Sequence, residues 1–436
     1  MGIHNNVDNA PSNTTTKSKY ATAMMSRRSI DSLAALLAIA LVTAASVARA
    51  ADDMALWLDA RKSDDAQLLS FIANDANRDD VIRARITLAD RAMNQSTDTV
   101  AEHLVAAEAL LSPDTIAADI AAAIRCQLEH RQGLASAAQS CGMLEAADTS
   151  AINNELVAAF WNMTLGYYYY REGDHPKSVA LAYDALPLAE SIGDHDLMAA
   201  AHNMIGLHFG TQLRPRMSLI HFETALEHAR QMVAPEFKIL IHLNLASSYT
   251  YLGRAREALE LLIEAQATPV VDLYPTRQLV VQSMIAQAKI ELGDTIGVEQ
   301  ALLETIKTVQ DSVLPDAMTF AWTGLGRVQL ASNRPRDALA NFDRVLATVD
   351  KDFETGLDHP RVQLIVVPYA VALRESGSVE EAMALLQSVV AAIPEDEPDQ
   401  LLVDALNELA ATQRASGDTA AALTTNERAV RVNTLL

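Results

Sequence analysis

Histidine gathers in one stretch of this sequence, and imidazole is the commonest metal ligand among side chains. Five of the eleven histidines stand between residues 202 and 242, at His202, His208, His221, His228 and His242. The ligands of one metal ion must converge on a point. His221 and His228 are seven residues apart, which places them two turns apart on one predicted helix and too far apart for one ion. We therefore expect no metal site and no cofactor, and interpret these histidines as ordinary polar positions on helices.

The chain has two cysteines, Cys126 and Cys141. Two thiols cannot form a disulfide framework or a four-cysteine zinc site. In the repeat described below, Cys126 takes a small position on one predicted helix, and Cys141 lies on the next helix of the same unit. They can form one disulfide in an oxidising compartment or remain two small buried residues, and the sequence leaves both possibilities open.

No pattern in the sequence is typical of an active site. It contains no glycine-rich phosphate loop, no His-Glu-x-x-His and no Gly-x-Ser-x-Gly. Carboxylates are abundant, but runs such as Glu380-Glu381 and Glu395-Asp396-Glu397 are interpreted as solvated faces and linkers. No two of them stand out as a general acid–base pair. We predict a protein without enzymatic activity.

The chain of 436 residues is strongly acidic, with 56 Asp and Glu against 34 Lys and Arg and a formal net charge of −22. Such a chain repels phosphate backbones, so we expect no nucleic-acid partner. Only 16 glycines and 14 prolines occur, which excludes collagen-like and Pro/Gly-rich disordered chains. The length suits two or three ordinary domains or one long array of repeats.

The first fifty residues are typical of a secretory signal peptide. Arg27-Arg28 precedes an apolar run from Leu33 to Val47, and Ala48-Arg49-Ala50 provides a small-residue cleavage site. The apolar run is shorter than the ~20 residues of a membrane span, although an uncleaved N-terminal anchor is the alternative. The signal is complete without the residues before Met24 or Met25, either of which can be the true start. We expect residues 1–50 to be removed on export to a bacterial periplasm, and no membrane span in the remainder.

The rest of the chain repeats with a period of forty residues. Glycine, or asparagine in its place, marks the left-handed end of a helix. The glycine marks are Gly133, Gly173, Gly253, Gly293, Gly377 and Gly417, which are mostly spaced by multiples of forty. Leu213 and Asn333 fill the two gaps in this series, and a four-residue insertion near Asp352–His359 lengthens the unit before Gly377. Small residues stand seven places before and five places after the marks, which lets two helices approach closely. Pro235, Pro275 and Pro315 are also forty apart, and each begins a predicted helix. The pattern therefore predicts consecutive pairs of antiparallel helices.

These residues resemble the tetratricopeptide repeat. That family has Leu-Gly and an aromatic residue on its first helix, Gly at the turn, and Ala, Phe and Ala on its second helix. Matching positions include Leu165-Gly166, Tyr169 and Gly173, then Gly206, Phe209, Phe222 and Ala225, and later Trp322, Leu325-Gly326, Ala338 and Phe342. The resemblance covers residues 116–436 in eight units, and residues 51–115 form an N-terminal helical cap with a degenerate repeat.

The resemblance implies an all-α fold, a right-handed solenoid of antiparallel helix pairs with a concave groove. The forty-residue period is similar to that of the periplasmic sensory region of membrane diguanylate cyclases. The family binds peptides or partner proteins in the groove formed by the first helices. On the inward positions of those helices we expect Tyr167, Tyr170, Arg171, Asn203, Asn244, Tyr251, Gln287, Arg327, Arg374 and Arg414.

Arginines and tyrosines divide this predicted groove into two parts. Arg327, Arg374 and Arg414 fall on inward positions of three successive units, where guanidinium groups suit an acidic side chain or a terminal carboxylate. The alternative is that each pairs with a nearby acid, such as Glu291, Glu375 or Glu408. The tyrosines are expected to contact apolar groups of an extended peptide.

Two functional interpretations follow from the groove and the leader. The first is an exported, non-enzymatic scaffold that binds a protein or peptide. The alternative is the sensory ectodomain of a truncated or split signalling protein of the diguanylate cyclase or histidine kinase type, because no Gly-Gly-Asp/Glu-Glu-Phe motif occurs in the chain.

Overall fold

The computed structural model describes residues 54–74, 77–93, 96–112, 115–146, 154–212, 214–232, 235–268, 275–309, 318–348, 360–394 and 400–435. Residues 58–436 form one compact unit, and of residues 1–57 only 54–57 are described. The expected signal peptide, Leu213, Pro315 and the acidic run at 395–397 lie outside the described residues.

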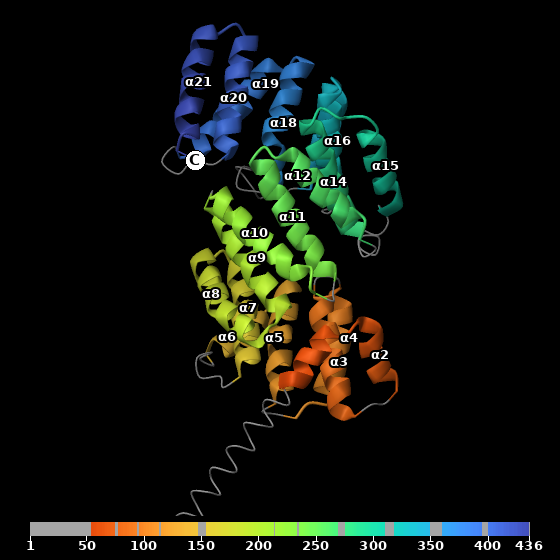
Figure 1. Ribbon diagram of the computed structural model, residues 1–436. Helices are drawn as coiled ribbons and strands as arrows, with labels where there is room; N and C mark the ends of the chain where they lie inside the picture. Colours follow the sequence, from red (N-terminus) through yellow and green to blue (C-terminus); the bar gives the residue numbers. More distant parts are fainter. Residues whose placement is uncertain are drawn as a thin grey trace, which may run out of the picture. The chain divides into compact units, whose positions relative to one another are not determined.

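Every regular element in the described part of the chain is an α-helix (Figure 1). The N-terminal helices are α2 (Asp65–Ala73), α3 (Arg78–Ala92) and α4 (Thr97–Glu108). Eight helix pairs follow: α5 (Ile116–Arg131) and α6 (Ala137–Ala146), α7 (Glu155–Arg171) and α8 (His175–Ile192), α9 (His195–Thr211) and α10 (Pro215–Ala229), α11 (Pro235–Tyr251) and α12 (Ala255–Gln266), α14 (Pro275–Glu291) and α15 (Val298–Val309), α16 (Met318–Ala331) and α17 (Pro335–Leu346), α18 (Pro360–Ser376) and α19 (Val379–Ala392), and α20 (Gln400–Ala415) and α21 (Thr419–Asn433). The prediction of an all-helical fold built from helix pairs is confirmed.

The first helix of each pair ends in the same way. The residue that follows the turn position donates its N–H to the carbonyl five residues earlier. For example, Asp174 donates to Tyr169 at 2.9 Å, and Arg254 donates to Tyr249 at 2.8 Å. This bond closes a helix whose last residue is left-handed. Asn333 has φ 58°, the one positive value at a non-glycine residue in the described part of the chain. Asparagine therefore does replace glycine in this unit of the series.

Small residues on the first helix face large ones on the second, as the repeat pattern predicts. A Cβ added to Gly206 of α9 would lie 2.7 Å from Cε1 of Phe222 on α10, and Phe222 is buried. Gly326 of α16 faces Phe342 of α17 in the same way. Because real Cβ atoms do not approach a ring so closely, glycine is required at these positions.

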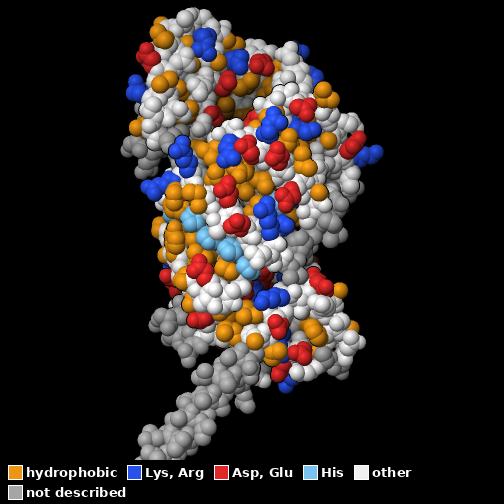
Figure 2. Space-filling model, in the orientation of Figure 1, with side chains coloured by type: hydrophobic (Ala, Val, Ile, Leu, Met, Phe, Trp, Pro, Cys, Tyr) orange, Lys and Arg blue, Asp and Glu red, His pale blue; other side chains and the backbone are white. Residues whose placement is uncertain are grey.

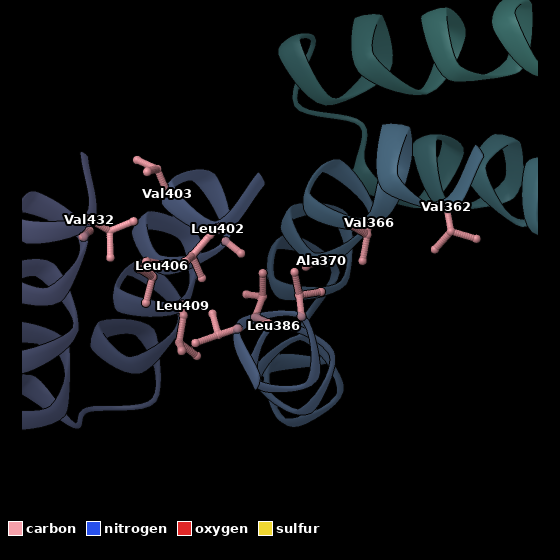
Figure 3. Close-up of a cluster of buried hydrophobic side chains, with 13 residues drawn as sticks. Val362, Val366, Ala370, Leu386, Leu402, Val403, Leu406, Leu409 and Val432 are labelled. Carbon is pink, nitrogen blue, oxygen red and sulfur yellow. The ribbon is translucent and has the colours of Figure 1, made fainter. Parts of the chain in front are cut away.

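The hydrophobic core continues from one pair into the next. Figure 3 shows this in the last two pairs, where side chains of α18 and α19 meet those of α20. The buried residues there include Val366, Ala370, Leu386, Leu402, Leu406 and Leu409. No unit buries its apolar faces alone, so each is stabilised by its neighbours. Within the described residues, no helix is both long and apolar enough to cross a membrane.

Substituting the small residue tests this packing. We expect Gly206→Ala to lower the free energy of unfolding by about 1–3 kcal/mol, because the new methyl group overpacks against a ring that cannot move. The measurement is chemical denaturation followed by circular dichroism.

Gly142 on α6 provides the matched control, because a Cβ added there meets nothing within 4 Å. Gly142→Ala should raise stability by about 1 kcal/mol through helix propensity alone. Equal effects at the two glycines would contradict the close-approach interpretation.

Candidate functional site

The first helices α7, α9 and α11 line a cavity of about 400 Å³, which we name the groove cavity. Its wall includes Met163, Tyr167, Tyr170 and Arg171 from α7, Asn203 and Leu207 from α9, and Asn244 from α11. An adjoining cavity of about 300 Å³ shares Tyr170, Leu207 and Asn244 and reaches Tyr251. The structure thus brings together six of the ten residues expected on inward positions. Their role in binding stays a prediction.

Two polar groups on this wall are buried without a hydrogen bond of ordinary geometry. Asn203 is fully buried, and its Oδ1 accepts a hydrogen bond of 2.8 Å from Nδ2 of Asn244. Asn203 Nδ2 and Tyr167 Oη make no hydrogen bond of ordinary geometry. Asn203 does lower the pKa of the phenol through a weak contact, but burial outweighs it and raises the pKa of Tyr167. Each unpaired donor costs about 1–3 kcal/mol, which a carbonyl or carboxylate from a ligand would recover.

Positive charge gathers beside these donors. Arg131, the last residue of α5, lines the groove cavity with Arg171, and its Nη1 donates to the carbonyl of Met93 at 2.6 Å. Burial lowers the pKa of Arg131, and the neighbouring cations Arg171 and Arg277 lower it further. These three guanidinium groups bring positive charge to one part of a protein whose net charge is −22.

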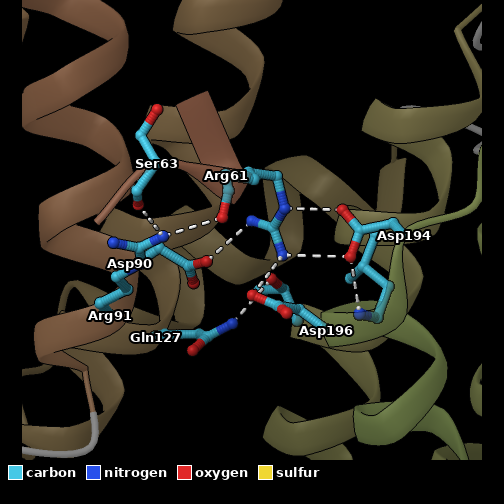
Figure 4. Close-up of polar contacts among 9 residues, drawn as sticks. Arg61, Ser63, Asp90, Arg91, Gln127, Asp194 and Asp196 are labelled. Carbon is cyan, nitrogen blue, oxygen red and sulfur yellow. Dashed lines mark hydrogen bonds and ion pairs between the residues drawn. The ribbon is translucent and has the colours of Figure 1, made fainter. Parts of the chain in front are cut away.

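A buried ion cluster adjoins the groove cavity (Figure 4). Arg61 Nε donates to Asp194 Oδ2 at 2.6 Å, Arg61 Nη1 donates to Asp90 Oδ2 at 2.9 Å, and Asp196 Oδ2 lies 3.7 Å from Arg61 Nη2. Asp194 also caps α9 by accepting from the N–H of Leu197. Arg91 of α3 donates to the carbonyls of Arg61 and Ser63 at 2.8 Å each. The cluster therefore joins the helical stretch before α2 to α3 and to the start of α9.

One arginine in this cluster faces three carboxylates. Burial opposes the charge of Arg61, but Asp194, Asp90 and Asp196 outweigh it and raise the pKa of Arg61. Burial raises the pKa of Asp90 as well. Burial also raises the pKa of Asp196 to about 6 from an ordinary 3.8, with Arg61 opposing the shift and the other two carboxylates adding to it. Asp196 is thus an acid of this cluster that takes up a proton on mild acidification.

Replacing Asp196 tests this assignment through pH. The folded protein binds the Asp196 proton more tightly than the unfolded chain does, so the stability from this group is complete below the ordinary pKa and is lost as pH rises through 6. Asp196→Asn cannot ionise. Relative to the wild type, its free energy of unfolding should rise by about 2 kcal/mol from pH 4 to pH 7.

The measurement is denaturation at several pH values. Asp184→Asn on the exposed face of α8 is the control, and it should change the denaturation midpoint little. A difference between Asp196→Asn and wild type that stays constant with pH would contradict the shifted pKa of Asp196.

The other four residues expected in the groove do not line these two cavities. Gln287 donates to Glu291 at 3.2 Å on α14. Arg374 lies 3.3 Å from Glu408 and 3.6 Å from Glu375, two of the acids named as alternative partners. Burial lowers the pKa of Arg327, with Glu291 and Asp404 opposing. Arg414 is exposed on α20. The cationic part of the groove in this structure is therefore at α5 and α7.

Cys126 and Cys141 form a disulfide that joins α5 to α6. Both residues are buried. The sequence leaves open whether the two cysteines form a disulfide or stay as thiols, and the structure contains the disulfide.

Several residues of the site are missing from the sequence-based expectation. The repeat could have pointed to Arg131, because this residue stands forty residues before Arg171 and ends the equivalent helix. No sequence pattern points to the ion cluster of Arg61, Asp90, Asp194 and Asp196. Arg61 and Asp194 are 133 positions apart and follow no repeat.

Comparison with known proteins agrees with this architecture. Residues 156–231 match the family model described as tetratricopeptide repeat. No curated protein matches the chain in sequence. The apo form of the quorum sensor NprR from B. thuringiensis is similar in structure, with TM-score 0.56, 12% identity, and coverage of 82% of this chain and 99% of that one.

Two further solved structures share the fold. A Rap protein complexed with competence and sporulation factor has TM-score 0.56 and 12% identity, covering 81% of this chain and 97% of that one. Aspartyl phosphate phosphatase F from Bacillus subtilis has TM-score 0.50 and 12% identity, covering 81% and 94%. At this identity the likeness shows a common helical-repeat fold. The matched family model is a repeat family and not a catalytic one.

Proposed function

We propose that this chain is a non-enzymatic scaffold that binds a peptide, or an extended segment of a partner protein, in the groove cavity along α7, α9 and α11. The observation that supports this most directly is the buried Nδ2 of Asn203 on the cavity wall, which makes no hydrogen bond of ordinary geometry. Its Oδ1 is held by Asn244, which directs the amide and leaves the N–H groups for a ligand carbonyl. Main-chain carbonyls are the acceptors that every peptide carries.

The lining suits an extended chain more than a compact small molecule. The groove cavity and the adjoining cavity follow three successive first helices and share residues, so one ligand can contact both. Tyr170 lies in the shared part, and Tyr167 and Tyr251 lie in one cavity each. Their rings contribute apolar contact at a low cost in side-chain entropy. The complex of a Rap protein with competence and sporulation factor is a precedent for binding by this fold.

The carboxylates of the groove cavity are poorly placed for catalysis. A protein of this fold is called a phosphatase, so the fold alone does not decide the question. The two carboxylates on the cavity wall, Asp90 and Asp196, are engaged in ion pairs with Arg61. A general acid or base needs a free path to the substrate proton, which a carboxylate held by arginine lacks.

The charges further specify the ligand. Arg131 and Arg171 line the cavity, Arg277 is near them, and Arg171 makes no ion pair with a described residue. We propose that the ligand places a C-terminal carboxylate or an acidic side chain here. The sequence-based prediction placed the acidic group of the ligand at Arg327, Arg374 and Arg414. The ligand proposed here therefore runs in the opposite direction along the groove.

Peptide selection tests the ligand and its direction. We expect peptides selected from a random library displayed with free C-termini to be enriched in terminal or penultimate acidic residues. Arg171→Gln should weaken their binding at least about tenfold, because a charge-assisted hydrogen bond is lost. It should also flatten the salt dependence of the affinity.

Arg414→Gln is the matched control for this measurement. Like Arg171, Arg414 lies in the last turn of a first helix, but it is outside the groove cavity. The control should bind as the wild type does. Selected peptides that bind Arg171→Gln with unchanged affinity would exclude the anionic subsite.

We further propose export to the periplasm with removal of residues 1–50. The disulfide between Cys126 and Cys141 supports an oxidising compartment, because such bonds persist there and are reduced in a bacterial cytoplasm.

Fractionation of a bacterium that expresses the full chain tests export. We expect the protein in the osmotic-shock fraction, with Ala51 as its N-terminal residue by Edman sequencing or intact mass. Changing Ala48 and Ala50 to Glu should leave an uncleaved precursor, since the peptidase needs small residues at these positions. An intact leader on soluble wild-type protein would contradict the proposal.

A further inference from the structure

Four histidines form two facing pairs between α9 and α10. His195 and His202 are seven residues apart on α9, and His221 and His228 are seven apart on α10. The two helices are antiparallel, so His195 faces His228 and His202 faces His221. In both pairs the two Nδ1 atoms are 3.1 Å apart. His221 and His228 are too far apart on α10 to share an ion, but each has a histidine of α9 beside it.

The four rings lie in one row at the protein surface. Ring centroids are 5.3 Å apart between His195 and His228, 5.8 Å between His228 and His202, and 5.4 Å between His202 and His221. Phe209 stacks on His221 at the end of the row. Figure 2 shows histidine side chains following one another along one face of the molecule. All four are partly exposed, which leaves the row accessible to a solvated ion.

In each pair the two Nδ1 atoms are joined by a hydrogen bond, and their spacing also suits two ligands on one ion. A zinc–imidazole bond is about 2.0–2.1 Å, so two such nitrogens stand about 3.3 Å apart in a tetrahedral complex and about 2.9 Å apart in a square-planar one. The observed 3.1 Å lies between these values. Without an ion, one ring of each pair must place its proton on Nδ1. When an ion binds, the proton of that ring moves from Nδ1 to Nε2, so both rings carry their proton on Nε2 and no proton is released.

Three of the four rings are in the form that binds a metal. Burial, together with the neighbouring rings of His221 and His228, lowers the pKa of His202 to about 4. Burial also lowers the pKa values of His221 and His228. These rings are therefore neutral near pH 7, with lone pairs available. Glu190 and Glu227 lie close enough to His228 to act on its pKa, and their charges favour a cation at that pair.

We propose that each facing pair of histidines binds one divalent transition-metal ion, Zn²⁺ or Cu²⁺, at its two Nδ1 atoms. Two ions bind per chain, and water completes each coordination shell. Among the described residues, no group of three or more His, Cys, Asp or Glu surrounds one point, so each ion has two protein ligands and exchanges readily. Each ion links α9 to α10, beside the groove cavity that α9 lines.

Calorimetric titration of the full chain with zinc chloride tests the proposal. The wild type should bind two ions at neutral pH. His221→Asn and His228→Asn should each bind one. The double variant should bind none. His103→Asn on α4 is the control, because its ring has no histidine neighbour in the described part of the chain, and it should bind two.

Saturating Zn²⁺ should raise the melting temperature of the wild type and leave that of the double variant unchanged, since ions that bind the folded state stabilise it. Unchanged stoichiometry in the single variants, or no binding by the wild type, would overturn the proposal.

Electron paramagnetic resonance of Cu²⁺ bound to the wild type needs no variant and so does not depend on how the substitutions fold. Coupling to two imidazole nitrogens per ion is expected. A spectrum with one nitrogen or with oxygen ligands alone would exclude the paired sites.

Discussion

The structure depends on one contact made repeatedly, between a small residue on the first helix of a pair and a large side chain on the second. At Gly206 and Phe222 the separation leaves no room for a methyl group. This close approach determines how near the two helices lie, and the left-handed turn after the first helix determines where the second begins. Because the next pair packs on the same surfaces, an error at one contact is transmitted to its neighbours. The regular spacing of the inward positions follows from this contact.

The groove cavity occurs where the regular array meets an irregular N-terminal part. The cation of Arg61 binds Asp194, the residue that caps α9, and Asp90 of α3. Removing one partner of such a buried pair costs about 3–5 kcal/mol, because it leaves a charge without compensation. The cluster therefore holds the start of α9 against α3 and keeps one end of the groove cavity in place. Its excess of carboxylate over arginine makes this junction sensitive to pH.

The two proposed binding sites use different faces of the same helix. Asn203 on α9 lines the groove cavity, whereas His202, its neighbour in sequence, belongs to the histidine row between α9 and α10. Adjacent residues on a helix point about 100° apart, so one helix can serve both sites without sharing side chains. An ion that fixes α10 on α9 would also restrict how far α9 moves when a ligand enters the groove.

The sequence by itself determined the period, the ends of the helices and the all-helical class, because these depend on local chemistry repeated every forty residues. It also placed Tyr167, Tyr170, Arg171 and Asn203 on the inward side, since that follows from their spacing relative to Gly166 and Gly206. Tertiary structure alone decided which arginines face the cavity and which are paired: Arg374 meets Glu408 of the next unit, while Arg171 meets Arg131 of the previous one. It also decided the pairs Arg61–Asp194 and His195–His228. Such pairs join residues far apart in the chain, and their formation depends on how helices pack and not on the periodicity of one helix.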